Sequence, residues 1–136
     1  MIHFDVIMPS YAKTPDMKAI TEKALQTLFD SEDPQNIRFR AVVFEQAPEV
    51  RYIRIDTKGH MLETIHYKYT FNYNRVLNDG IRRTNAPYVL LCNNDLEFHK
   101  GFAGKLLPAF YACDSLSPYC PISHKDRIQA GPHLWK

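Results

Sequence analysis

The sequence predicts an α/β fold with a mostly parallel central sheet. The predicted elements follow the order strand, helix, strand and then helix, strand, which is the order of a parallel α/β sheet. One predicted strand is apolar on both faces over the run Ala41 to Phe44, as a central parallel strand should be. Polar residues follow three of the predicted strands, where such sheets bind ligands.

Length and composition point to one globular domain, residues 1–136. The 136 residues are 45% hydrophobic and 24% charged, and the net charge of +2, with scattered basic residues, predicts no nucleic-acid binding. No apolar run approaches the roughly 20 residues of a transmembrane segment, and no signal-peptide pattern begins the chain, so we expect a cytoplasmic protein. Cys92, Cys113 and Cys120 form no C-x-x-C pair, and we expect reduced thiols.

The first predicted strand covers His3 to Met8, and Pro9 is expected to end it. Asp16 can then cap a helix that ends near Asp30. The apolar residues of this helix are spaced three and four apart and form one buried face: Met17, Ile20, Ala24, Leu25 and Leu28.

The middle of the chain predicts further strands. Ile37 to Phe44 is the second strand, and Glu45 lies at its carboxyl end. Val50 to Ile55 alternates apolar and basic residues, and Thr64 to Tyr69 is rich in β-formers, so one or two strands are expected here. The turn between them is predicted at Lys58 and the glycine that follows.

A second helix is predicted from Asn72 or Asn74 to Arg83, with Val76, Leu77 and Ile81 on its inner side. A buried strand, 88–92, follows it. A later helix is suggested by a set of large apolar residues around Pro108: Phe102, Leu106, Leu107, Phe110 and Tyr111. Residues 1–112 are expected to form the core of the domain, and 113–136 an irregular tail.

Three polar clusters at predicted strand ends should converge in the fold: Pro9-Ser10-Tyr11, Glu45-Gln46 and Asn93-Asn94-Asp95. Asp95, flanked by amides, suits Mg²⁺ or Mn²⁺, which keep waters and phosphate oxygens as further ligands. Equally, Asp95 can cap the next turn while the asparagines satisfy loop backbone groups.

The other two clusters also leave alternatives open. Glu45 can accept hydrogen bonds from a ribose or base, or it can be a solvated loop carboxylate. Tyr11 can stack on a base or simply be an exposed loop tyrosine. Neither a G-x-G-x-x-G fingerprint nor a P-loop occurs, so bound phosphates would need a metal. The six histidines have no zinc-site spacing.

Three segments in order, FDVIMPSY, AVVFE and FNYNRVLNDGIRRTNAPYVLLCNNDLEF, resemble the nucleotide-binding half of family 2 glycosyltransferases of the rhamnosyl and O-antigen type. The third segment is the most specific, with Phe-Asn-Tyr at 71–73, Asn-Asp-Gly at 78–80 and Asn-Asn-Asp at 93–95. The resemblance covers roughly residues 3–112, and DRIQAGP at 126–132 is similar to a later segment of the family. It implies the GT-A fold, a three-layer αβα sandwich, with a truncated or minimal C-terminal part.

The resemblance also implies roles for individual residues. Asp95 would bind Mn²⁺ or Mg²⁺ on the donor's diphosphate, and Glu45 would hold the nucleoside. Arg75 or Asn78 would contact the sugar diphosphate. The remaining residues of the nucleotide pocket would be Pro9, Ser10, Tyr11, Asn93 and Asn94.

The activity implied is transfer of a sugar, with inversion, from a nucleotide donor to a hydroxyl acceptor; UDP-sugars are the family's commonest donors. A general base is required, for which Asp114 and Asp126 are the candidates, and His124 or His133 can add a metal ligand. The alternatives are a noncatalytic sugar-nucleotide-binding module and a nucleotidyltransferase of similar architecture. A second copy of the chain could complete the acceptor cleft in a homo-oligomer.

Overall fold

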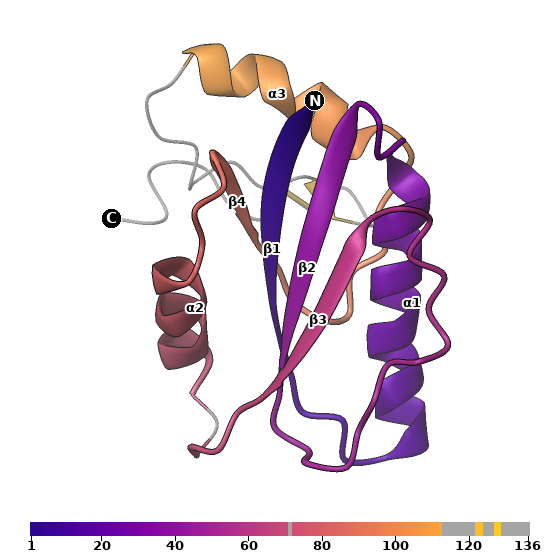
Figure 1. Ribbon diagram of the computed structural model, residues 1–136, viewed down its shortest axis with the longest axis vertical. Coiled ribbons are helices and arrows are strands. Elements are labelled where there is room, and N and C mark those ends of the chain that lie inside the picture. Colours follow the sequence, from indigo (N-terminus) through magenta and orange to yellow (C-terminus); the bar gives the residue numbers. More distant parts are fainter. Residues whose placement is uncertain (71, 113–121, 124–126, 129–136) are drawn as a thin grey trace. The chain divides into compact units, whose positions relative to one another are not determined.

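The computed structural model describes residues 1–70, 72–112, 122–123 and 127–128. The chain divides into two compact units, Met1–Phe102 and Ala103–Lys136. In the first unit, β1 (Ile2–Ser10), β2 (Ile37–Glu45), β3 (Met61–His66) and β4 (Tyr88–Leu91) form a parallel sheet in the order β3-β2-β1-β4 (Figure 1). The predicted α/β fold is confirmed.

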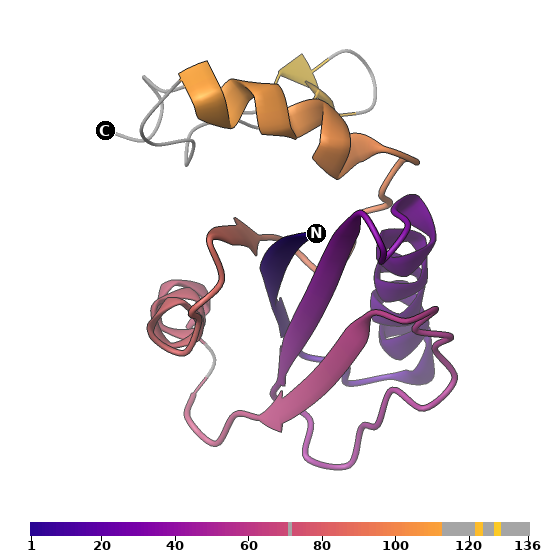
Figure 2. The same cartoon turned by 45° about the horizontal axis from the view of Figure 1, so that its top comes forward.

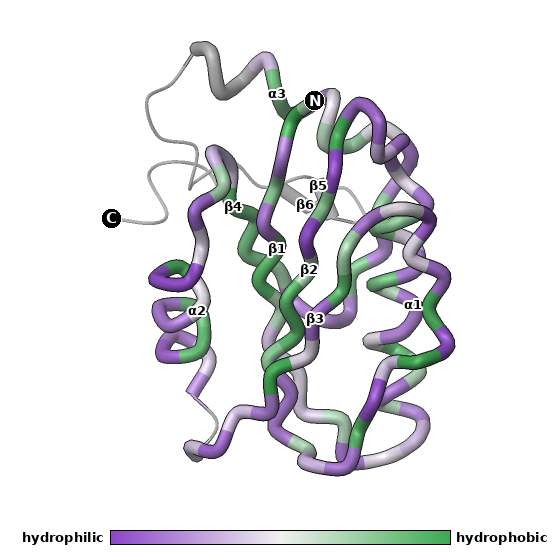
Figure 3. Tube along the Cα trace, in the orientation of Figure 1, coloured by the Kyte–Doolittle hydropathy of each residue, from purple (hydrophilic) through white to green (hydrophobic). Residues whose placement is uncertain are grey.

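Helices cover both faces of this sheet. The strands β1, β2 and β3 run between α1 (Pro15–Ser31) on one side and α2 (Tyr73–Arg82) on the other (Figure 2). The strands carry much of the hydrophobic sequence, whereas α2 alternates between polar and apolar residues (Figure 3). Within the residues described, no helix has the length and apolar character needed to cross a membrane.

The cap of the first helix lies two residues before the predicted cap, Asp16. Thr14 is the N-cap, with φ −132°, and its Oγ1 accepts a hydrogen bond of 3.2 Å from the Met17 backbone N–H. Pro15 takes the first helical position, where its missing N–H costs nothing. Met17 and Ile20, predicted to face the core, are exposed, and the buried side is formed by Thr21, Ala24, Leu25, Leu28 and Phe29.

The prediction that Pro9 ends the first strand is wrong, because β1 continues to Ser10. The backbone polar groups of Ile7 point toward β4, because the Ile7 carbonyl accepts a hydrogen bond from the Cys92 N–H. The backbone nitrogen of Pro9, two residues later, points the same way. The last paired residue of β4 is Leu91, opposite Ile7. The missing N–H of Pro9 therefore lies past the end of that ladder, where no hydrogen bond is lost.

The strand predicted at 50–55 is absent, and residues 46–60 connect β2 to β3 without a strand. The alternation there reflects burial of Tyr52 between exposed neighbours, of which Ile53 is 84% exposed. The predicted turn is confirmed, with φ 51° at Lys58 and 91° at Gly59. The following strand, β3, begins at Met61, three residues earlier than expected.

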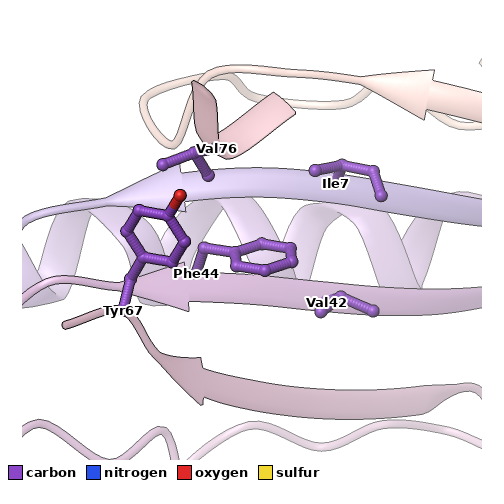
Figure 4. Packing of buried hydrophobic residues seen from close by; sticks show 5 residues of the cluster. All are labelled: Ile7, Val42, Phe44, Tyr67 and Val76. Carbon is purple, nitrogen blue, oxygen red and sulfur yellow. The ribbon is translucent and has the colours of Figure 1, made fainter. Parts of the chain in front are cut away.

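The second helix begins where predicted, with Asn72 as its N-cap. Its inner side differs from the prediction, because Ile81 is 43% exposed and Gly80 is buried instead. A Cβ at position 80 would lie 2.5 Å from Cγ2 of Ile7, so only glycine allows this close approach to the sheet. Figure 4 shows the core beneath α2, formed by Ile7, Val42, Phe44, Tyr67 and Val76.

The last predicted strand is shorter and less buried than expected, because β4 ends at Leu91 and its four residues are half-buried or exposed. Helix α3 (Phe102–Ala112) is confirmed and contains Pro108. In the tail predicted as irregular, the structure describes β5 (Ile122–Ser123) and β6 (Arg127–Ile128), an antiparallel pair.

Candidate functional site

The three polar clusters meet at the carboxyl edge of the sheet, as predicted. Ser10 and Glu45 are paired residues at the ends of β1 and β2, and the Ser10 hydroxyl donates to Glu45 Oε1 over 2.7 Å. From the loop after β4, Asn94 Nδ2 donates to Thr21 Oγ1 over 2.9 Å and lies 3.5 Å from Ser10 Oγ. One hydrogen-bonded network therefore joins the ends of two strands, helix α1 and the loop after β4.

Glu45 is the centre of this network and is 0% exposed. Its Oε2 accepts from the backbone N–H groups of Ala12 and Ala47, at 2.9 and 3.0 Å. Its Oε1 accepts from the hydroxyls of Ser10 and Tyr52. Four donors fill the acceptor positions of a carboxylate, so Glu45 is not the solvated carboxylate considered above and has no free oxygen for a nucleoside.

Two residues of the network, Tyr52 and Thr21, were not predicted from sequence. Burial, and then the hydrogen bond to Glu45, raise the pKa of Tyr52 above its usual value of 10.0, so its hydroxyl remains a donor. The alternating pattern that suggested a strand at 50–55 was the one signal of a buried Tyr52. Thr21 lies on the buried side of α1, where the apolar spacing of its neighbours gave no sign of a polar contact.

The residues Asn93 to Asp95 form an exposed loop held at both asparagines. Asn93 Oδ1 accepts a hydrogen bond of 2.6 Å from the Tyr73 hydroxyl, and Asn94 is half-buried against the network. Asp95 is exposed, and no hydrogen bond or ion pair reaches its carboxylate from the part of the chain that the structure describes. The alternative role of Asp95 as a cap for the next turn therefore has no support among these residues.

Tyr73 places its phenol close to this loop. Its pKa is raised by burial first, and then by the charges of Cys92 and Asp95 when ionised. The hydroxyl thus stays protonated at neutral pH and donates to Asn93. Tyr73 lies in the Phe-Asn-Tyr motif, but the sequence gave no indication that it contacts the loop 20 residues further along the chain.

Aromatic and cationic side chains pair near the same strand ends. The Arg75 guanidinium lies 4.2 Å from the ring centroid of Tyr69, and Lys13 Nζ lies 4.7 Å from that of the exposed Tyr11. Gln46 joins this group, since its Nε2 donates to the Tyr69 carbonyl. Such pairs offer flat faces and positive charge to a planar anionic ligand.

The predicted site residues thus differ in their exposure to solvent. Pro9, Ser10 and Glu45 are buried, whereas Tyr11, Arg75, Asn78, Asn93 and Asp95 are exposed and Asn94 is intermediate. The candidate bases Asp114 and Asp126 and the candidate metal ligands His124 and His133 lie outside the described residues.

A divalent cation at Asp95 fits only one mode of binding. Among the described residues, no group of three or more His, Cys, Asp or Glu side chains can hold a metal ion. One exposed carboxylate suits an ion that takes its other ligands from water and from substrate phosphates, as Mg²⁺ and Mn²⁺ commonly do. The residues present therefore fit a cation that binds together with a diphosphate.

Two concavities of about 290 and 280 Å³ lie elsewhere, over the sheet on the side of α2. Both are lined by Asp5, Arg40 and Arg83, and neither is lined by a predicted site residue. Arg40 pairs with Asp5 and with Glu63, at 3.5 and 2.9 Å. These two ion pairs account for charged side chains in the lining of the concavities, and the candidate site remains the carboxyl edge.

No profile of a known protein family matches the chain, and no curated protein sequence does. The resemblance to family 2 glycosyltransferases therefore depends on the three sequence segments and on the order of the motifs within them.

Proposed function

We propose that this protein is a metal-dependent glycosyltransferase that moves a sugar from a nucleotide-diphosphate donor, of which UDP-sugars are the first to test, to a hydroxyl acceptor with inversion. The observation that carries the proposal is the exposed Asp95 carboxylate, which has no partner among the described residues. It follows a strand at the edge where Ser10, Glu45 and Asn94 meet.

In this proposal Asp95 holds Mn²⁺ or Mg²⁺ against the donor diphosphate. The ion supplies the positive charge that stabilises the departing nucleoside diphosphate. Arg75 adds a second positive charge near the diphosphate, and the exposed ring of Tyr11 offers a face on which a base can stack. Glu45 binds the backbone N–H groups of Ala12 and Ala47, and so fixes the loops that follow β1 and β2 without touching the donor.

Calorimetry with UDP, in the presence and absence of Mn²⁺, tests this proposal. We expect Mn²⁺ to strengthen UDP binding to the wild type. Asp95→Asn should remove that gain, while UDP binding without metal stays the same or becomes stronger because the repelling negative charge is gone. The matched control is Asp16→Asn, which alters an exposed aspartate in the first turn of α1. Equal Mn²⁺ dependence in the wild type and Asp95→Asn would sink the proposal.

One observation favours the alternative of a noncatalytic sugar-nucleotide-binding module. Among the described residues, two carboxylates near the site already have partners: Glu97 pairs with Lys23 at 2.6 Å, and Asp79 accepts from the Tyr67 hydroxyl. The hydrogen bond from Lys23 lowers the pKa of Glu97, which makes this carboxylate a weaker general base. Release of UDP from a panel of donors separates the two functions, because a binding module binds donor and Mn²⁺ without turnover.

We also propose a cytoplasmic location. Cys92 is a free, buried thiol, which agrees with a reducing compartment. Fractionation of the native host cells, with the protein detected by antibody, tests this point.

A further inference from the structure

The loop that bears Asp95 is held by two hydrogen-bonded clamps from opposite sides of the sheet. The first clamp joins Asn94 Nδ2 to Thr21 Oγ1 of α1, over 2.9 Å. The second joins the hydroxyl of Tyr73, the first residue of α2, to Asn93 Oδ1 over 2.6 Å. The two residues immediately before Asp95 are therefore each tied to a different helix.

The two clamps differ in their surroundings. The first is part of the buried network around Glu45, so its loss would disturb the core of the site. The second is at the surface, where Tyr73 is 39% exposed and Asn93 is exposed. Removal of the Tyr73 hydroxyl therefore changes the hold on the loop and leaves the buried network intact.

We propose that Tyr73 is a positioning residue, whose hydroxyl fixes Asn93 and thereby holds Asp95 in the orientation that receives the cation and the donor diphosphate. This inference rests on the proposed function. Tyr73 acts through Asn93 and needs no contact with the donor. Asn93, which accepts the hydrogen bond of 2.6 Å, lies two residues before Asp95 in the same loop.

The cap of α2 fixes the backbone of the residue that holds the loop. Asn72 caps the helix by accepting from Arg75 N–H over 3.1 Å, so the backbone of the adjacent Tyr73 is fixed. A loop already held in its binding geometry does not lose that conformational freedom when ligand binds. The Phe-Asn-Tyr motif thereby acquires a physical role, in which Asn72 sets the helix and Tyr73 sets the loop.

The test compares Tyr73→Phe with Tyr67→Phe, a matched control. Tyr67 also donates through its hydroxyl, but to Asp79 on α2 rather than to the loop. For Tyr73→Phe we expect faster amide hydrogen exchange at Cys92, the hydrogen-bonded amide that directly precedes the loop. Mn²⁺-dependent UDP binding should be about tenfold weaker, which corresponds to about 1.4 kcal/mol. UDP binding without metal should be unchanged. Tyr67→Phe should change neither hydrogen exchange at the loop nor Mn²⁺-dependent UDP binding.

A double-mutant cycle with Asn93→Ala identifies the contact itself. If the hydroxyl acts through Asn93, Tyr73→Phe and Asn93→Ala should each weaken binding, and the double variant should be no weaker than either single variant. Additive losses, or a Tyr73→Phe variant with unchanged exchange and binding within twofold of wild type, overturn the inference. If wild type itself shows no Mn²⁺-dependent UDP binding, the proposed function fails together with the role toward the ion. Hydrogen exchange then still decides whether Tyr73 clamps the loop.

Discussion

Glu45 offers the sharpest test of how the site is built. Replacing it with glutamine keeps its size but removes its charge and turns one acceptor oxygen into an NH₂ donor. The better amide orientation keeps the oxygen toward the N–H groups of Ala12 and Ala47, which cannot turn away. The NH₂ group then faces the hydroxyls of Ser10 and Tyr52, which must rotate and find other acceptors.

The expected cost follows from the four bonds. Hydrogen bonds to a charged group contribute about 1.5–3 kcal/mol each and neutral ones about 1 kcal/mol. Two bonds weakened to neutral strength and two rearranged sum to a loss of about 2–4 kcal/mol, after allowance for the lower cost of burying a neutral group. In a chain of 136 residues, about 4 °C of Tm per kcal/mol gives a fall of about 8–16 °C.

Thermal and urea unfolding of Glu45→Gln measure this loss directly. The control is Glu49→Gln, the same change at an exposed position of the following loop, which should stay within about 0.5 kcal/mol of wild type. A fall of less than 2 °C for Glu45→Gln, or an equal fall for Glu49→Gln, would refute the conclusion that the buried carboxylate holds the strand ends together.

Three further changes test the fold. Gly80→Ala should destabilise by about 1–3 kcal/mol in urea, because the new methyl meets Ile7, although alanine normally favours a helix; a gain in stability would show that the helix can move away. Burial raises the pKa of the Cys92 thiol from 9.0 to about 12, so the unfolded state releases this proton first as the pH rises. Stability should fall by up to about 1.4 kcal/mol per pH unit from pH 9 to 12, and Cys92→Ala should lose less over that window; equal pH slopes would contradict the sign. His60→Phe removes Nδ1, which accepts a hydrogen bond of 3.0 Å from the Phe39 N–H. The free energy of unfolding should fall by about 1–3 kcal/mol and the Phe39 amide should exchange faster; unchanged exchange would contradict this prediction.

The sheet was predictable because buried parallel strands leave a strong pattern. The apolar run 41–44 places β2 within one residue of its observed end, and the polar residues that follow mark the carboxyl edge. Asn72 was one of the two predicted starts of the second helix, the other being Asn74, and it is the N-cap of α2. Strand β2 and the start of α2 were predictable because each is determined by a short local pattern of apolar and polar residues, and the fold keeps both patterns.

The errors arose where tertiary contacts override local pattern. Thr14 and Asp16 are both good caps, and Pro15 decides between them by taking the first helical position. The alternation at 50–55 was read as a strand, but Tyr52 is buried because its hydroxyl donates a hydrogen bond to Glu45. The buried side of α2 is shifted toward Gly80, since a helix lies closest to a sheet where a side chain is missing.

The sequence places both acidic residues of the site directly at or after strand ends, and the structure gives their carboxylates opposite environments. Glu45 is enclosed by four donors, whereas Asp95 is exposed and without a hydrogen-bond partner among the described residues. A diphosphate placed beside Asp95 would be repelled by like charge unless a cation lay between them. The dependence of UDP binding on Mn²⁺ is therefore the property that follows most directly from this edge of the sheet, and a carboxylate-to-amide change at position 95 should reduce it without weakening UDP alone.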